Sequence, residues 1–288
     1  MDGLLIVDKP KGITSQSVCL KLKRILGAKK CGHNGTLDPN ATGVMVVAVD
    51  SATKLLKLIH EHDKEYIATI VFGLDSNTLD MDSDITKDIS MNPSIKNIQL
   101  ALEELKSRKT QIPPLTSAVK IDGMKLYEYQ RKGIDVKVPS RNVELKEYEI
   151  LSDLRFINNH YEIDIKISVS KGYFVRSLAR DLGELLGGCA ILKDLRRTKS
   201  GEYKIEDAIP LDNITKDNII PIFSFFDLPK VYVKDYMIPL VKNGITMDER
   251  QTSIHGTFYV DSSMGILAIY EEVDNLKYKP ILIFKEGK

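Results

Sequence analysis

The sequence predicts an α+β fold in which helices pack on a mixed or antiparallel sheet. Residues 161–169 alternate strictly between apolar and polar side chains, which is typical of a half-buried antiparallel strand. Residues 175–186 instead carry their apolar side chains at helical spacing and end at Gly187-Gly188. Strand and helix patterns are interspersed along the 288 residues, and this interspersion favours the α+β class.

Local patterns predict the other elements of the N-terminal half. We expect Ser15 to cap a helix that stops at Gly27, with a buried face that carries Val18, Leu22, Ile25 and Leu26. Another helix is expected after Pro93. Apolar runs predict strands at residues 4–7, 44–49 and 66–72.

The C-terminal residues have a different pattern. Short apolar runs at residues 257–260, 265–270 and 280–284 are separated by Asp, Ser and Gly turns, which indicates a small β-rich module. We therefore expect a large domain over residues 1–228 and a small one over residues 229–288.

The chemistry-bearing residues concentrate between residues 32 and 43. Glycines flank the pair His33-Asn34, and a proline follows Asp38, so a tight loop should hold one carboxylate rigidly. The apolar run that follows reads as a buried strand, and an acid at the end of such a strand is well placed for catalysis. The same residue types also build purely structural turns, and the local pattern alone favours that interpretation.

This segment resembles the catalytic signature of the TruB-type tRNA pseudouridine synthases, and other motifs of that family follow in order. They are Leu5 to Gly12 with Thr14-Ser15, Lys64-Glu65-Tyr66, Gln111 to Pro114, Ser170-Lys171-Gly172, Val175 to Ala179, and Leu195 to Thr198 with Gly201. The resemblance covers roughly the first 205 residues, about the scale of one large domain.

The resemblance implies the reaction and the residues that carry it. The family isomerises uridine to pseudouridine, here expected at uridine-55 in the T-loop of tRNA, with the base flipped out of its stack. Asp38 would be the catalytic carboxylate, Arg176 its cationic partner, and Tyr66 the ring that stacks on the flipped uracil. The isomerisation consumes nothing, so neither a cofactor nor a metal is expected.

Further substrate contacts are implied at four positions. His33 would occupy the space left by the flipped nucleotide, and Lys9, Phe174 and Leu195 match other binding positions of the family. The family usually has tyrosine where this chain has Phe174, so a hydroxyl that could hydrogen-bond to the Asp-Arg pair is missing. In the C-terminal part, residues 240–244 weakly match the start of a PUA-type RNA-binding domain, although an inert stabilising module is a close alternative.

Charge is segregated along the chain although the formal net charge is only +1. Residues 1–57 contain nine Lys or Arg and four Asp or Glu, and residues 106–146 contain ten and four. Residues 60–104 contain three basic and ten acidic groups. Two basic blocks are typical of a surface that neutralises RNA phosphates, whereas solvated surface charge is the plainer interpretation without the motifs.

The rest of the composition sets bounds. The N-terminus has no basic leader, no stretch approaches the length of a membrane span, and the cysteines Cys19, Cys31 and Cys189 are few and unpatterned. These features predict a cytoplasmic protein with reduced thiols and no membrane contact. The absence of a long basic tail or large insertions favours a monomer that needs no protein partner and no guide RNA.

Two patterns imitate metal sites. Asp80, Asp82 and Asp84 resemble the start of a calcium loop, but Ile85 stands at its glycine position, so we expect no chelation there. The run of residues 60–63, His-Glu-His-Asp, lies in a polar connection and is expected to be solvated.

Two other functions stay open beside the isomerase. A non-catalytic tRNA-binding and folding factor would use the same basic surface without needing the Asp38 carboxylate. A hydrolase using His33 with Asp38 would consume water and need no RNA. The chain offers this hydrolase no nucleophilic serine or cysteine motif nearby, so it ranks last.

Overall fold

The computed structural model describes residues 2–59 and 63–284. Its main sheet contains eleven strands within those ranges. They are β1 (Gly3–Lys9), β2 (Cys31–Asn34), β3 (Thr42–Val49), β4 (Lys64–Phe72), β11 (Leu145–Ile150), β12 (Arg155–Ile157), β13 (His160–Val169), β14 (Ala190–Ser200), β15 (Tyr203–Lys204), β16 (Ile209–Pro210) and β17 (Ile220–Pro221).

Shorter pairs and a separate sheet complete the strands. The three small two-stranded sheets pair β5 (Leu74–Ser76) with β6 (Ile85–Asp88), β7 (Thr110–Gln111) with β10 (Arg141–Asn142), and β8 (Lys120–Ile121) with β9 (Met124–Lys125). The C-terminal four-stranded sheet consists of β18 (Lys230–Tyr232), β19 (Thr257–Asp261), β20 (Ala268–Asp274) and β21 (Lys277–Ile283).

Helices flank both sheets. The α-helices of the described residues are α1 (Ser15–Leu26), α2 (Leu56–Ile59), α3 (Ile95–Ser107), α4 (Leu126–Arg131), α5 (Val175–Leu185), α6 (Ile222–Phe225) and α7 (Ile238–Lys242). The 3₁₀ helices are η1 (Asp50–Leu55), η2 (Ile205–Asp207), η3 (Leu211–Asn213), η4 (Lys216–Asn218) and η5 (Asp235–Met237). No helix in the described part of the chain is long and apolar enough to cross a bilayer.

The main sheet is mixed, with the central path β11-β13-β4-β14-β3-β1-β16. Antiparallel neighbours predominate, but β14 runs parallel to β3 and β1 runs parallel to β16. Helices and strands alternate along the chain and share one large unit. The predicted α+β class is therefore confirmed.

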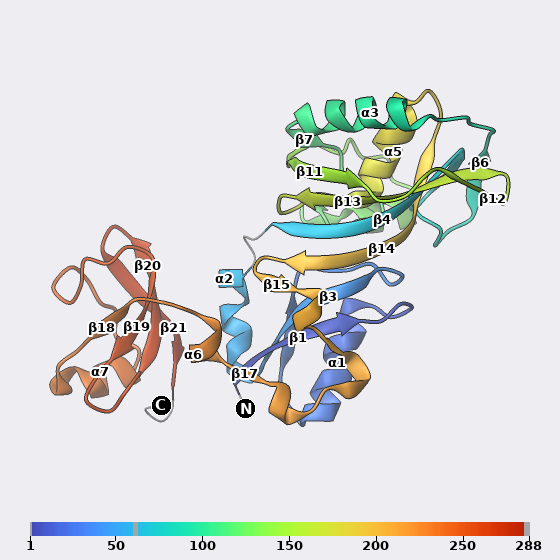
Figure 1. The fold of residues 1–288 in the computed structure, drawn as a ribbon. Helices are drawn as coiled ribbons and strands as arrows, with labels where there is room; N and C mark the ends of the chain where they lie inside the picture. Colours follow the sequence, from blue (N-terminus) through green and yellow to red (C-terminus); the bar gives the residue numbers. More distant parts are fainter. Residues whose placement is uncertain (1, 60–62, 285–288) are drawn as a thin grey trace.

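A seam divides the main sheet into two halves. β14 pairs with β4 along most of its length, but its ladder with β3 contains only the pairs Arg196↔Thr42 and Arg197↔Gly43. Figure 1 shows β4, β13 and β11 with α3 and α5 above this seam, and β3, β1 and α1 below it. Each half has its own hydrophobic core, one under α3 and α5 and one under α1.

The C-terminal sheet lies beside the lower half in Figure 1. Its apolar side chains pack with those of β1, β3 and η1 in a third core cluster, which includes Leu4, Val46, Tyr259, Ile269 and Leu282. The expected β-rich character of this part is confirmed, but the strand expected from residue 265 begins at Ala268. The delay arises because Ser262 and Gly265 close a turn through paired backbone hydrogen bonds.

Helix α1 occupies the predicted range, with two differences. Thr14, rather than Ser15, is the N-cap, because its side chain accepts the backbone N–H of Ser17. Ile25 was expected in the buried face but is 46% exposed, because it lies at the edge of the stripe that the other three apolar residues form. The helix ends as expected at Gly27, which has φ +66°.

The segment expected as one tight loop is partly a strand. Residues 31–34 form β2, which runs antiparallel to β3 with His33 opposite Val47. The loop proper therefore begins at Gly35, and His33 sits on the edge strand that leads into it.

Candidate active site

Asp38 lies in the loop between β2 and β3, and its neighbours are buried. Leu37 and Ala41 pack into the core beneath α3 and α5. The hydroxyl of Ser15 accepts the N–H of Leu37 at 2.9 Å and donates to the Leu37 carbonyl at 3.0 Å. Apolar packing thus attaches the loop to one half of the main sheet, and hydrogen bonds attach it to the other half.

Lys9, at the end of β1, supports the same loop. Its Nζ donates to the carbonyls of Ala41 at 2.7 Å, Pro39 at 2.9 Å and Pro10 at 3.0 Å. The side chain is fully buried, and this burial lowers the pKa of Lys9 to about 8 against the attraction of Asp38. Although expected as a substrate contact, Lys9 is buried and hydrogen-bonds to the loop that carries Asp38.

Arg176 is the cation that reaches Asp38. Its Nε lies 3.0 Å from Oδ2 of Asp38, and its Nη2 donates to Oδ1 at 3.3 Å, so the contact is two-pronged. Arg176 is only 7% exposed, so it is not a surface arginine. The Asp38 side chain is 38% exposed, so one carboxylate face remains open to solvent.

Three residues of other segments fix the guanidinium. Arg176 Nη1 donates to Thr116 Oγ1 at 2.7 Å and to the Thr78 carbonyl at 2.9 Å, and it lies 3.6 Å from Oδ2 of Asp80. Since every nitrogen of the guanidinium has a partner, its plane is set before any substrate binds.

Asp80 is therefore part of the site, although its sequence context resembled a calcium loop. Its carboxylate accepts the Thr78 hydroxyl and the Asp82 N–H, and burial raises its pKa despite these bonds and the charge of Arg176. The described residues contain no group of three or more His, Cys, Asp or Glu side chains placed to hold a metal. The other imitation, residues 60–63, falls mostly outside the described residues.

Arg197, on β14, hydrogen-bonds to β3 and to the loop that carries Asp38. Its Nε donates to the Val44 carbonyl at 2.6 Å and its Nη2 to the Gly35 carbonyl at 3.2 Å, with the side chain 1% exposed. Gly43 has φ +106°, and a Cβ there would lie 2.2 Å from the Arg197 carbonyl oxygen. The close approach of β3 to β14 therefore requires glycine at this position.

The other expected site residues surround this centre at different depths. Tyr66, on β4, is 7% exposed and lies in the same core cluster as Leu37. Phe174 is half-buried just before α5, where its backbone N–H and carbonyl pair with the Gln111 side-chain amide at 2.9 and 3.1 Å. Leu195, on β14, lines the pocket beside Asp38.

That pocket is nearly closed. Its volume is about 20 Å³, and its lining includes Asp38, Asp80, Asp82 and Leu195. The amide of Asn40 donates to Asp82 and so connects the catalytic loop with the acidic segment opposite. Because such a space holds about one water molecule, a nucleobase enters only if these segments move apart.

Sequence reasoning missed Thr116, Asp80 and Arg197 as parts of the site. Arg197 belongs to the quoted run of residues 195–198, so its motif was visible but its role was not. Thr116 follows the Pro113-Pro114 turn, and no local pattern connects it with a helix sixty residues later.

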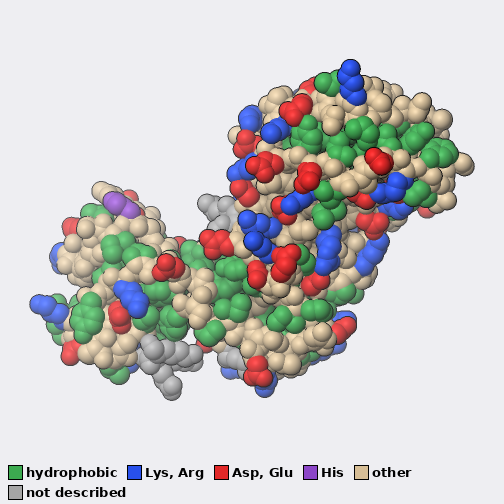
Figure 2. Space-filling view, viewed as in Figure 1, with side chains coloured by type: hydrophobic (Ala, Val, Ile, Leu, Met, Phe, Trp, Pro, Cys, Tyr) green, Lys and Arg blue, Asp and Glu red, His purple; other side chains and the backbone are tan. Residues whose placement is uncertain are grey.

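The basic blocks of the sequence do not form a uniformly basic face in the view of Figure 2. Lys and Arg side chains lie among Asp and Glu over the region of β3, β4 and β14. Several of these pairs join in ion pairs across strands, such as Arg196 with Asp8 at 2.8 Å. Any RNA docking on this face therefore has local cationic points rather than a continuous positive field.

Solved structures share this architecture. A chain of the structure titled "Crystal Structure of a Cbf5-Nop10-Gar1 Complex" superposes with TM-score 0.67 and 25% identity, covering 99% of this chain and 84% of that one. A chain of "Structure of H/ACA RNP bound to a substrate RNA containing 2'-deoxyuridine" gives TM-score 0.64 at 22% identity, covering 99% and 85%. The fold is that of a pseudouridine synthase, an isomerase.

Family models identify the family of pseudouridine synthases to which the chain belongs. Residues 23–175 match "TruB family pseudouridylate synthase (N terminal domain)", and residues 176–220 match "tRNA pseudouridylate synthase B C-terminal domain". This chain belongs to the TruB family of pseudouridylate synthases.

Curated relatives named tRNA pseudouridine synthase B match most or all of the chain. The protein of Lactobacillus acidophilus is 35% identical and covers 100% of both chains. That of Lactobacillus delbrueckii subsp. bulgaricus is 39% identical over 84% of this chain and 85% of its own. That of Geobacillus kaustophilus is 38% identical over 85% and 90%.

Proposed function

We propose that this protein converts uridine-55 in the T-loop of tRNA to pseudouridine, with Asp38 as the reacting carboxylate and Arg176 as its charged partner. Family membership gives the coarser activity, isomerisation of uridine to pseudouridine in tRNA. The T-loop target, the roles of single residues and base flipping are the added content of the proposal.

One observation carries the proposal: the two-pronged contact of Arg176 with Asp38, at 3.0 and 3.3 Å. A guanidinium stays charged when buried, so it keeps a fixed positive charge beside Asp38 after RNA excludes water from the site. Preorganised charge of this kind is the usual source of most of an enzyme's rate enhancement.

The reaction requires that carboxylate. The bond between ribose C1′ and uracil N1 breaks, the uracil turns, and a new bond forms between C1′ and C5 while the C5 proton is lost to solvent and N1 gains one. Asp38 starts the cleavage, as carboxylates do in glycosidic chemistry. Tyr66 would stack on the detached uracil, and Leu195 would cover its edge.

Base flipping would open the nearly closed pocket. Extruding a nucleotide costs a few kcal/mol, least for a base outside a duplex, which favours a loop as target. His33, on the strand that leads into the catalytic loop, would fill the space that the nucleotide leaves. Separation of Asn40 from Asp82 would admit the uracil.

The C-terminal domain, residues 229–288, is proposed as a PUA-like RNA-binding module. Tyr232 and Tyr236 are 66% and 69% exposed, and aromatic rings of this kind stack on unpaired bases. The Tyr232→Ala/Tyr236→Ala variant should bind full tRNA more weakly with unchanged single-turnover rate at saturation. Unchanged affinity would favour an inert stabilising role.

We propose that the protein acts as a monomer in the cytoplasm and needs no protein partner. Light scattering of the purified protein with and without tRNA measures the number of chains in the complex. One chain per tRNA in an active complex is the expected result.

The test is tritium release from tRNA labelled at uridine C5. Wild-type protein should release about one equivalent per tRNA without added metal or nucleotide, and a transcript with cytidine at position 55 should release none from that site. The Asp38→Asn variant should bind tRNA but release nothing, while Asp217→Asn, an exposed surface change, should match wild type. Release by the Asp38→Asn variant at the wild-type rate would refute the assignment, and binding without release by the wild type would indicate a folding factor.

A further inference from the structure

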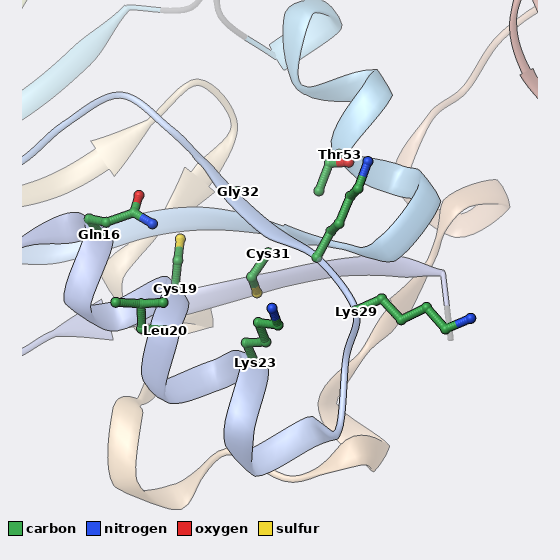
Figure 3. Close-up of a pocket in the computed structure, with 9 residues that line it drawn as sticks. Gln16, Cys19, Leu20, Lys23, Lys29, Cys31, Gly32 and Thr53 are labelled. Atoms are coloured by element: carbon green, nitrogen blue, oxygen red, sulfur yellow. The ribbon is translucent and has the colours of Figure 1, made fainter.

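A second pocket lies away from Asp38, between α1, η1 and the start of β2. Its volume is about 330 Å³, and its lining consists of Gln16, Cys19, Leu20, Lys23, Lys29, Lys30, Cys31, Gly32 and Thr53. Figure 3 shows Cys19, Leu20 and Lys23 projecting from α1, with Thr53 across from them beyond Gly32. It is far larger than the space beside Asp38, and no step of the proposed reaction uses it.

The rim of this pocket is cationic. Lys23, Lys29 and Lys30 are all exposed, and none forms an ion pair with another described residue. Figure 3 shows the Lys23 side chain pointing toward Cys31 and that of Lys29 extending outward from the rim. Three lysines at the rim of one pocket favour a ligand with more than one negative charge.

The backbone fixes the lysines in this arrangement. Asp50, in η1, accepts the N–H groups of Lys29 at 2.7 Å and Lys30 at 3.1 Å, and its own N–H donates to the Lys30 carbonyl at 2.9 Å. The turn after α1 is thus held on η1, and the acidic group nearest the pocket is already engaged by backbone amides. The positive charge of the rim is therefore presented in a set geometry.

The floor of the pocket is less polar. Cys19 is buried, Cys31 is partly exposed, and Leu20 is 50% exposed. The hydrogen bond with Cys19 holds the pKa of the Cys31 thiol below its usual value, and the nearby charge of Lys23 acts in the same direction. A cationic rim above an apolar floor suits a sugar-phosphate group, with the phosphate at the lysines and the ribose on Leu20.

β2 connects the pocket, at Cys31, with the segment that leads into the loop of Asp38. Cys31 and His33 lie on the same face of the strand because side chains alternate, and they are separated by about 7 Å along it. The chain then runs from His33 into the loop of Asp38. An RNA stem that follows β2 away from the loop of Asp38 would reach Lys23, Lys29 and Lys30.

We infer that the pocket of Lys23, Lys29 and Lys30 binds backbone phosphates of the tRNA stem that adjoins the flipped uridine. This inference rests on the proposed tRNA substrate and adds a second anchoring point to it. Phosphate contacts set register and orientation without reading sequence. The pocket would thus fix how the T-arm enters, while Asp38 and Arg176 act on one nucleotide.

Thiol protection tests the inference on a protein with its lysines intact. Iodoacetamide alkylation of Cys31 is followed by peptide mass spectrometry in the Asp38→Asn protein, with and without unmodified tRNA. At about ten times the dissociation constant, tRNA should slow Cys31 alkylation about tenfold. Buried Cys189, on the other half of the sheet, serves as the control and should react at the same rate in both samples. Equal Cys31 rates with saturating tRNA would overturn the inference.

Charge variants give an independent readout. The Lys23→Gln/Lys29→Gln/Lys30→Gln variant should lower the slope of log affinity against log salt by about 2 to 3, because each lost phosphate contact removes just under one unit. Its single-turnover rate at saturating tRNA should equal that of wild type. The control variant carries the same charge change on β6, α3 and η4, at Lys87, Lys96 and Lys216, and should keep the wild-type slope.

The outcomes separate this inference from the proposed function. An unchanged salt slope with normal tritium release would reject the pocket and leave the isomerase intact. Absence of tritium release by wild-type protein would reject the proposed function, whatever the alkylation result. Protection of Cys31 by ATP alone, at concentrations where tRNA gives none, would also overturn the inference and assign the pocket to free nucleotides.

Discussion

Replacing Arg176 with lysine keeps the positive charge beside Asp38 but removes the fork that delivers it. The guanidinium contacts Asp38 through two nitrogens, Nε at 3.0 Å and Nη2 at 3.3 Å, and Nη1 binds Thr116 and the Thr78 carbonyl. A lysine has one nitrogen and cannot serve all these partners at once.

The expected magnitude follows from the lost contacts. One hydrogen bond between charged groups contributes about 1.5–3 kcal/mol, so losing one prong to Asp38 should slow the chemical step by about 10- to 100-fold. The unpaired Thr78 carbonyl and Thr116 hydroxyl should lower the free energy of unfolding by about 1–3 kcal/mol each. Arg176→Lys should therefore lose rate at saturating tRNA and stability together.

Single-turnover tritium release at saturating tRNA measures the chemical step, and denaturant unfolding measures stability. Arg180→Lys is the matched control, since Arg180 lies on the next turn of α5 and pairs with Asp181 instead of Asp38. Its rate should equal that of wild type. A wild-type rate for Arg176→Lys would refute the argument that the two-pronged geometry, beyond the charge alone, supports catalysis.

Three further results are expected. Gly43→Ala should lower the free energy of unfolding by more than about 3 kcal/mol, because its Cβ would lie 2.2 Å from the Arg197 carbonyl oxygen. The control is Gly12→Ala, whose Cβ would meet nothing within 4 Å. In the same denaturant titration it should lower the free energy of unfolding much less. The pKa of Lys9 is about 8 in the folded state against its ordinary 10.5, so the unfolded chain binds more protons between these pH values. The free energy of unfolding of the wild type, relative to that of Lys9→Met, should therefore rise by about 1–3 kcal/mol across this window. A difference between the two proteins that does not change with pH would contradict the burial argument. Phe174→Tyr should change the single-turnover rate by no more than about twofold, because the ring is only half-buried and the backbone of residue 174 stays paired with Gln111. A large loss of rate would show that this position does not accommodate the added hydroxyl.

Periodic elements could be predicted from the sequence because their signal is local. The α1 and α5 helices and the β13 strand lie where their apolar spacing indicated, because one face of each contacts a core. Local signals fail where tertiary contacts decide. The Ser15 hydroxyl binds Leu37 instead of capping α1, and no spacing rule contains that distant partner.

The sequence predicted the motif residues of the candidate site, but it did not predict the residues that hold them in place. Asp38 and Arg176 were paired through resemblance to the family, and the structure brings them into contact. Asp80 was set aside because its neighbours imitated an incomplete calcium loop. The approach of Asp80 to Arg176 depends on where the acidic segment meets β14, because Asp80 forms an isolated parallel β-bridge with Leu192 there. Such a long-range contact leaves no pattern in the sequence.

The anchoring of the Asp38 loop ties activity to the cooperativity of folding. Leu37 and Ala41 belong to the core of one half of the main sheet, while Lys9 and Ser15 hold the same loop from the other half. The direct ladder between the halves is only two residue pairs long, so this loop is one of the principal links across it. Local opening of either half would withdraw the carboxylate from its arginine. Catalytic turnover should therefore disappear early in any stepwise unfolding, before the helices of either half are lost.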